Sequence, residues 1–231
     1  MLLYHFFKSK HALDSIENKH IKIALLTELN DPLELLPIFT KKRDLISWEE
    51  TKTNFAQKHG IICFSKIWYD PVMWSHYADN HKGIVLGFKI NDDKFQEVIY
   101  PKNDQRARLL IKNKWDTGTD KTPRGNALVL WSKYKSWQYE QEVRAWVDFD
   151  ETVTTVKTKE KVIKYLPTIK NKIVLHSIML GLNCDQKVSG ILKALHTSNY
   201  SNVNIYKICL SQHSYSLKRK KIKIAPGEET A

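Results

Sequence analysis

The chain has 231 residues, of which 42% are hydrophobic and 27% charged, so it can bury a core and does not resemble a disordered tail. Its 37 Lys and Arg residues outnumber 25 Asp and Glu residues, and the formal net charge of +12 favours a polyanion as partner. No stretch approaches the ~20 consecutive apolar residues of a membrane span, and residues 1–7 run into basic residues without the apolar core of a signal peptide. We therefore expect a cytoplasmic protein with no membrane partner.

The first half of the chain alternates between short apolar runs and helical patterns. The turn sequence Leu29-Asn30-Asp31-Pro32 precedes a long, mostly helical stretch, and Asp70-Pro71 opens a short helix. Strands are predicted at 2–7, 21–26, 61–65, 84–88 and 98–100, and helices at 9–18, 33–58 and 72–79.

The second half begins with a polar, turn-rich segment around 102–125, which we predict to be a mobile loop. Apolar and polar residues then alternate over 142–149, as in a strand. Helices are predicted at 126–137 and 185–197, an edge or hairpin segment at 152–165, and strands at 173–182, 203–210 and 215–224. The chain is therefore predicted to be a single α+β domain over 1–231, with a mixed, largely antiparallel sheet flanked by helices.

Several local strings occur together in a recognisable order. They are Leu3-Tyr4-His5-Phe6, Leu29-Asn30-Asp31-Pro32, Met73-Trp74-Ser75-His76-Tyr77-Ala78 with His81 and Gly83, Tyr139-Glu140-Gln141-Glu142-Val143-Arg144, and Ile178-Met179-Leu180-Gly181. Their order and spacing resemble a bacterial family known as domain of unknown function 2971. The similarity covers most of the chain.

The same arrangement is similar to that of ADP-ribosyltransferase-like toxins. In those enzymes a first-strand His or Arg, a strand bearing Ser or an aromatic residue, and a late Glu surround NAD. The resemblance implies an ADP-ribosyltransferase-like fold, NAD as co-substrate and no metal, with His5, Ser65 and Glu142 in the three positions. The usual H-G-[ST] and S-T-S strings are absent, because His5 is followed by Phe6-Phe7 and Ser65 by Lys66-Ile67.

The residue types of the late motif suit this chemistry. Cleavage of the nicotinamide–ribose bond builds positive charge on the ribose, which a carboxylate stabilises. If Glu140, Glu142 and Arg144 all lie in a strand, their side chains share one face. We predict that Glu142 and Glu140 are catalytic and that Arg144 holds a phosphate of the cofactor. The alternative is a solvated strand face with internal ion pairs.

Four further residues are predicted to bind the cofactor. A ring nitrogen of His5 can hydrogen-bond a ribose hydroxyl, Tyr4 and Tyr77 can stack on a ring of NAD, and Ser65 ends a buried strand. Each has a structural alternative, since a lone His in an apolar run and aromatic residues at helical spacing belong more often to a core, and Ser65 can be a strand-end cap.

Other classes of site have weaker support. Cys63, Cys184 and Cys209 are too few and too scattered for a disulfide framework, and none forms a zinc-type pair, so we expect buried reduced thiols. The spacing of His76 and His81 matches no metal loop, and there is no G-x-S-x-G, G-x-G-x-x-G or Walker string.

The basic run near the C-terminus suggests the acceptor of the reaction. Lys218, Arg219 and Lys220 can bind a phosphate backbone, and a chain with seven Trp and ten Tyr residues offers stacking surfaces for unpaired bases. We therefore expect transfer to single-stranded nucleic acid, with RNA favoured over DNA, by a toxin or anti-phage effector held by an antitoxin protein. The alternatives are the same reaction on a protein target, a non-catalytic nucleic-acid-binding module, and a metal-independent nuclease using His5 or His76 as general base.

Overall fold

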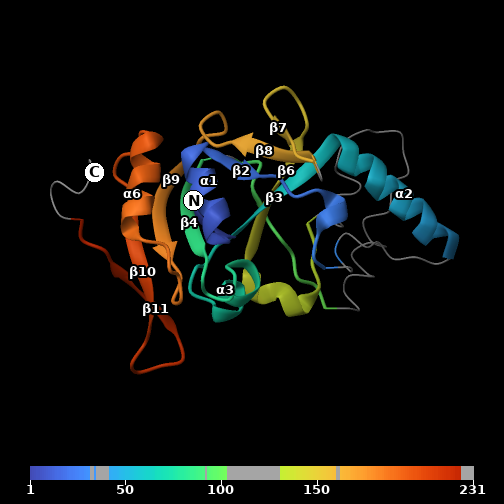
Figure 1. Cartoon of the computed structure of the whole chain (residues 1–231). Coiled ribbons are helices and arrows are strands. Elements are labelled where there is room, and N and C mark those ends of the chain that lie inside the picture. The colour runs from blue at the N-terminus through green and yellow to red at the C-terminus, as the bar shows by residue number, and fades with distance from the viewer. Residues whose placement is uncertain (32–33, 35–41, 92, 103–130, 160–161, 225–231) are drawn as a thin grey trace.

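A computed structural model of the chain describes all residues except 32–33, 35–41, 92, 103–130, 160–161 and 225–231, and the side chains of 42–48. At its centre is an eight-stranded mixed sheet with the order β11-β10-β9-β4-β1-β3-β6-β5, and a three-stranded sheet has the order β2-β8-β7 (Figure 1). The strands of the large sheet are β1 (Leu2–Phe7), β3 (His59–Ser65), β4 (Ile84–Ile90), β5 (Gln96–Glu97), β6 (Glu142–Asp148), β9 (Ile173–Leu180), β10 (Asn204–Leu210) and β11 (Leu217–Lys221). Those of the small sheet are β2 (His20–Lys22), β7 (Thr154–Lys157) and β8 (Val162–Pro167).

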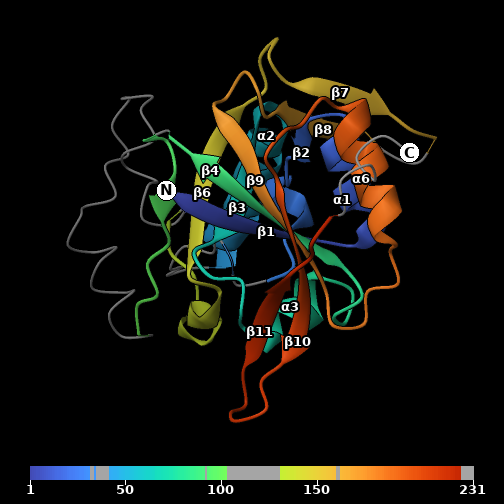
Figure 2. The ribbon, with the colours of Figure 1, turned by 90° about the vertical axis from the view of Figure 1, so that its left-hand side faces the viewer.

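The helices cover the large sheet unequally. They are α1 (Ser9–Glu17), α2 (Lys42–Lys58), α3 (Pro71–Tyr77) and α6 (Val188–Thr197), with 3-10 turns η1 (Leu26–Glu28) and η2 (Lys135–Glu140). Helices α1 and α6 lie together and bury Ile16 and Ile191 in the main core, whereas α3 buries Met73 and Trp74 against the other face (Figure 2). None of the helices among the described residues is both long and apolar enough to cross a bilayer.

The predicted α+β class with a mixed, mostly antiparallel sheet is confirmed. Neighbouring strands of the large sheet are antiparallel except β9 and β10, which are parallel and connected through α6. Strand β4 is buried along almost its whole length, as expected for a central strand with apolar cover on both sides.

Several predicted boundaries were wrong. The predicted strand at 21–26 is only β2, because the chain turns into η1. Residues 131–134 are not helical, so within 126–137 the only described helical residues are the start of η2. The helix predicted at 9–18 ends one residue earlier, as α1, with Lys8 at its N-cap, and Ser9 donates from Oγ to the Lys82 carbonyl at 2.9 Å. The predicted mobile loop around 102–125 lies outside the described residues apart from Lys102.

Helix α3 is short but firmly defined. Pro71 fixes its first turn, and the Asp70 carboxylate accepts hydrogen bonds from the Val72 and Met73 amides at 2.8 and 3.3 Å. Trp74 is fully buried and donates from Nε1 to the Trp68 carbonyl at 2.6 Å. These contacts fix the helix that carries Tyr77 towards η2 at one end of the sheet.

Candidate active site

A cavity of about 280 Å³ lies where β1, β3, α3 and η2 meet. It brings together six of the seven residues predicted to be catalytic or cofactor-binding, which come from distant parts of the chain. These are Tyr4, His5, Ser65, Tyr77, Glu140 and Glu142. The sequence prediction missed Lys133 and Glu34, which also line the cavity.

Strand register explains how three of these residues meet. Tyr4 on β1 pairs with Ser65 on β3, which in turn pairs with Glu142 on β6. Paired residues project to the same side of a sheet, so the three form a row across adjacent strands. The main-chain pairing of β1 with β3 is limited to Tyr4 and Ser65, whereas β1 pairs with β4 along its whole length.

Glu140 reaches the site by a different route from the predicted one. It does not lie in the strand but ends η2, and Gln141 follows with φ 43° in the left-handed region before β6 begins at Glu142. Ser65 fixes this turn by donating from Oγ to the Glu140 carbonyl at 2.6 Å and accepting from the Ile67 amide at 3.1 Å. Its hydroxyl therefore positions Glu140.

Five buried charges form one network at the cavity. Lys133 Nζ lies 2.7 Å from Glu140 Oε2, 3.3 Å from Glu142 Oε2 and 3.7 Å from Glu34 Oε2. Arg144 donates from Nε and Nη2 to the two oxygens of Glu142 at 2.8 Å each, and Nη2 also contacts Glu34. All five side chains are at most 5% exposed. Three carboxylates share two cations, which leaves one negative charge in excess in this network when all five groups are ionised.

The two catalytic candidates respond to burial in opposite ways. Burial alone would raise the pKa of Glu142, but Arg144 and then Lys133 outweigh it and lower the pKa to about 2. For Glu140, burial outweighs the attraction of Lys133, and the pKa is raised above its usual range. Glu142 is therefore firmly ionised at neutral pH, and Glu140 binds a proton more readily than an ordinary carboxylate.

Tyr77 connects the cavity to Glu140. Its hydroxyl donates to Glu140 Oε1 at 2.5 Å and accepts from Asn30 Nδ2 at 3.0 Å. Burial, followed by the nearby Glu140 charge, raises the pKa of Tyr77, so the phenol stays protonated. The ring that was predicted to stack on the cofactor thus also holds a catalytic candidate.

His5 lies beside the point where β1 and β3 pair. Its Nδ1 is 2.7 Å from the Cys63 carbonyl, and its ring contacts Phe7 and Phe64. Burial lowers the pKa of His5 to about 4, so the ring is neutral near pH 7. Because a carbonyl only accepts, Nδ1 carries the proton, and Nε2 has a lone pair that can accept from a hydroxyl group.

The remaining predicted residues lie away from the cavity lining. The Arg144 side chain is 1% exposed and does not line the cavity. Its hydrogen bonds to both oxygens of Glu142 position that carboxylate. Lys218, Arg219 and Lys220 are exposed on the edge strand β11, which three strands separate from β1.

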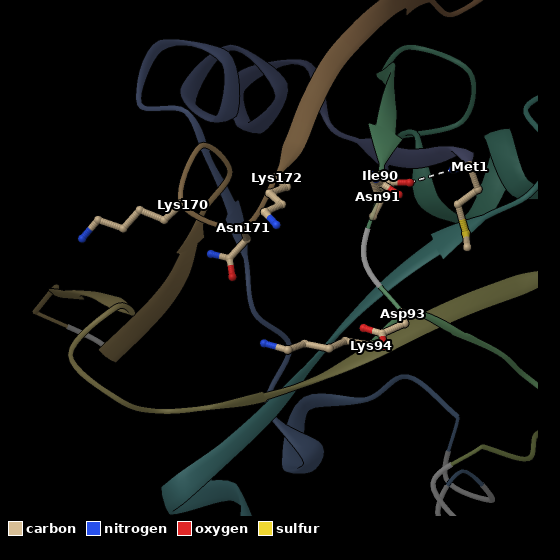
Figure 3. A pocket seen from close by; sticks show the side chains of 8 residues that line it. All are labelled: Met1, Ile90, Asn91, Asp93, Lys94, Lys170, Asn171 and Lys172. Atoms are coloured by element: carbon tan, nitrogen blue, oxygen red, sulfur yellow. Dashed lines mark hydrogen bonds between the residues drawn. The ribbon is translucent and has the colours of Figure 1, made fainter.

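Two wider hollows accompany the cavity. One of about 580 Å³ is lined by Lys66, Tyr100 and Gln138, and it shares Glu142 with the cavity. The other, of about 720 Å³, lies where the N-terminal ammonium donates to the Ile90 carbonyl at 2.7 Å and is lined by several lysines, including Lys94, but by none of the predicted residues (Figure 3). Among the described residues, no group of three or more His, Cys, Asp or Glu side chains is placed to hold a metal ion.

The fold and the site together define an α+β protein with a small, charged cavity at the junction of three strands. A family model described as protein of unknown function (DUF2971) matches residues 73–145, which confirms the family predicted from the sequence strings. The segment that is similar to this family contains α3, Lys133 and the late motif with Glu140, Glu142 and Arg144. No curated protein and no solved structure matches the chain.

Proposed function

We propose that the protein is an ADP-ribosyltransferase that uses NAD as donor and single-stranded nucleic acid as acceptor, with RNA favoured over DNA. The observation that carries this proposal is the excess of negative charge in the network of Glu34, Glu140, Glu142, Lys133 and Arg144. Among the described residues this buried network has one carboxylate more than it has cations, which favours a ligand that bears positive charge. The nicotinamide ring of NAD is such a group.

The strand arrangement supports the same reaction. His5, Ser65 and Glu142 lie on β1, β3 and β6, which are neighbours in the sheet. The resemblance to ADP-ribosyltransferases implies a His, a Ser and a Glu around one NAD site. Their approach to a common cavity is what this resemblance requires.

The size of the cavity limits what can enter. Ligand pockets are commonly ~300–1,000 Å³, and this cavity holds about 280 Å³. It therefore suits the nicotinamide and ribose end of NAD, while the adenosine end remains outside. In NAD a glycosidic bond joins ribose C1′ to nicotinamide. In the proposed reaction this bond breaks, its electron pair leaves with the nicotinamide, and C1′ forms a new bond to the acceptor.

The residues then have separate tasks. Glu142, kept ionised by Arg144 and Lys133, stabilises positive charge that develops at the ribose. His5 accepts a hydrogen bond from a ribose hydroxyl at Nε2. Glu140 takes the proton that the acceptor loses, and the hydrogen bond from Tyr77 holds the Glu140 carboxylate in place.

The net charge of +12 supports nucleic acid as the acceptor. An enzyme that modifies nucleic acid in its own cell needs restraint, so we place it among toxins or anti-phage effectors that act in the cytoplasm and are held by an antitoxin protein. The internal pairing of the five charges also fits a non-catalytic nucleic-acid-binding module in which the network only stabilises the fold.

Calorimetry and product analysis separate these two functions. Titration of NAD into the protein should show binding, and incubation should release nicotinamide, detected by chromatography. A protein that binds nucleic acid but neither binds NAD nor releases nicotinamide is the non-catalytic module, and the proposed reaction is then wrong.

A further inference from the structure

Arg219 lies over two aromatic rings at the edge of the large sheet. Its guanidinium carbon lies 4.6 Å from the centre of the Tyr206 ring and 5.1 Å from that of Trp68. The residue is exposed, and within the described ranges no carboxylate forms an ion pair with it. A guanidinium group that stacks through its faces keeps its N–H groups, which lie in its plane, for planar acceptors such as phosphate.

Strand register places Arg219 on the same side of the sheet as Tyr4 of the cavity lining. It pairs with Ile208 of β10, and Ile208 and Leu217 belong to the apolar cluster that contains Tyr4 and Met73 of the cavity lining. Side chains alternate along a strand, so Lys218 and Lys220 face the opposite side. The three basic residues of the sequence prediction therefore do not form one surface.

Trp68, which Arg219 contacts, belongs to a short segment that begins at the cavity. This segment runs from Ser65, which lines the cavity, to Asp70, which caps α3, and it carries Trp68 and Tyr69 with ring centres 5.7 Å apart. Tyr69 is 51% exposed. The β10–β11 hairpin extends beside α3 at this end of the molecule (Figure 2).

We propose that Arg219, Trp68, Tyr69 and Tyr206 form a landing site for a single-stranded nucleic acid whose next nucleotides reach the cavity. Arg219 binds a backbone phosphate, and the exposed Tyr69 ring stacks on an unpaired base. Charge complementarity favours this occupant, because Arg219 and Lys221, two residues apart on β11, pair with Ile208 and Tyr206 and project to this side of the sheet. The inference rests on the nucleic-acid part of the proposed function and deepens it.

Fluorescence anisotropy with labelled oligouridine, oligothymidine and a duplex of equal length tests this surface. We expect the single strands to bind more tightly than the duplex, with affinity falling steeply as salt rises. Arg219→Glu should weaken single-strand binding at least ~10-fold, and the matched reversal Lys220→Glu, on the other face of the same strand, at most ~3-fold. Tyr69→Ala should reduce the preference for single strands.

Thermal unfolding shows whether Arg219 only stabilises the fold. If Arg219→Ala lowers the melting temperature but Arg219→Glu and Lys220→Glu weaken binding equally, Arg219 only fastens the hairpin and the landing site is wrong. Absence of binding by the unmodified protein, or binding only to a protein acceptor, also overturns it. Nicotinamide release by the unmodified protein is measured separately. Binding with the expected pattern but without release contradicts the transferase reaction and leaves this surface intact.

Discussion

Glu140 and Glu142 are separated by one residue, yet their surroundings shift their pKa values in opposite directions. The difference arises from the cations. Among the described residues, Glu142 is bound by the cations of Arg144 and Lys133, whereas Glu140 is bound by that of Lys133 alone. Two carboxylates whose environments separate their proton affinities are suited to separate acid–base and electrostatic tasks.

Replacement of Glu142 should remove the charge that we propose to stabilise the reacting ribose. Glu142→Gln keeps the shape, so we expect transfer to fall at least ~100-fold. It also leaves buried cations short of a carboxylate, which costs up to about 3–5 kcal/mol of stability. Glu34→Gln is the matched control, since Glu34 contacts the same Arg144 and Lys133. Single-turnover rates measure the loss of transfer, and thermal unfolding measures the loss of stability, for each variant. An equal loss of transfer in both variants would contradict a special role for Glu142.

His5 offers a way to separate binding from packing. His5→Asn places an amide N–H near the position of Nδ1 and can still donate to the Cys63 carbonyl, but it lacks the acceptor at Nε2. We expect calorimetry to show NAD affinity reduced about 10-fold, the cost of roughly one hydrogen bond at ~1.4 kcal/mol. Nucleic-acid binding should be nearly unchanged. Unaltered NAD affinity together with a lower melting temperature would identify His5 as a core residue.

Proton release should accompany NAD binding. The pKa of Glu140 is raised by burial in the free protein, and a bound positive charge favours its ionised form, so the pKa falls and a proton leaves. Affinity should therefore rise with pH below the raised pKa of Glu140 and level off above it. Calorimetry in two buffers of different ionisation enthalpy measures the number of protons released on binding. Glu140→Gln should abolish the difference in binding enthalpy between the two buffers. Proton uptake by the unmodified protein would be the opposite of this prediction.

Lys133 and Glu34 could not be predicted as site residues. Glu34 meets Arg144 across 110 positions of the chain, and no local pattern of residue types indicates such a pair. Lys133 falls within the predicted helix at 126–137 but lies in a non-helical stretch before η2, so the predicted periodicity did not indicate where its side chain points. Buried charges of this kind become recognisable only when the fold brings their partners together.

Among the elements, the apolar strands were the most predictable. Strands β1, β3 and β9 are compact runs of large apolar residues between turn signals, and each was expected close to its observed bounds. Extension of the β6 strand pattern back to Glu140 was wrong, because Gln141 adopts a positive φ and reverses the chain. Alternation of residue types persists through such a turn, so period alone does not show where a strand begins.

Helix α3 links local sequence to the site, and its cap is open to a direct test. Asp70→Ala removes the acceptor for the Val72 and Met73 amides, and we expect a loss of about 1 kcal/mol in the free energy of unfolding. Asp70→Asn retains an acceptor oxygen and should lose much less. Chemical denaturation measures both. Equal stability of the Ala variant and the unmodified protein would show that Pro71 and the packing of Trp74 suffice to hold the helix.

At the scale of the whole molecule, one face of the large sheet carries Tyr4 of the cavity lining and Arg219 of the edge strand β11. Tyr4 and Met73 of the cavity lining, together with Ile208 and Leu217 of the β10–β11 hairpin, belong to one apolar cluster. This cluster thus connects the proposed cofactor site with the proposed landing site of the acceptor. The net charge of +12 supplies long-range attraction for a polyanion, and the site determines what is done to it.

Transfer of label from NAD tests the central claim most directly. The protein is incubated with NAD labelled in its adenylate group and, separately, with RNA, DNA and protein fractions, beside the Glu142→Gln variant. We expect label to remain on the nucleic acid, more on single-stranded RNA than on DNA, and to be lost with Glu142→Gln. Label retained only by the protein fraction would contradict the nucleic-acid acceptor, and label retained by no fraction, without release of nicotinamide, would contradict the transferase itself.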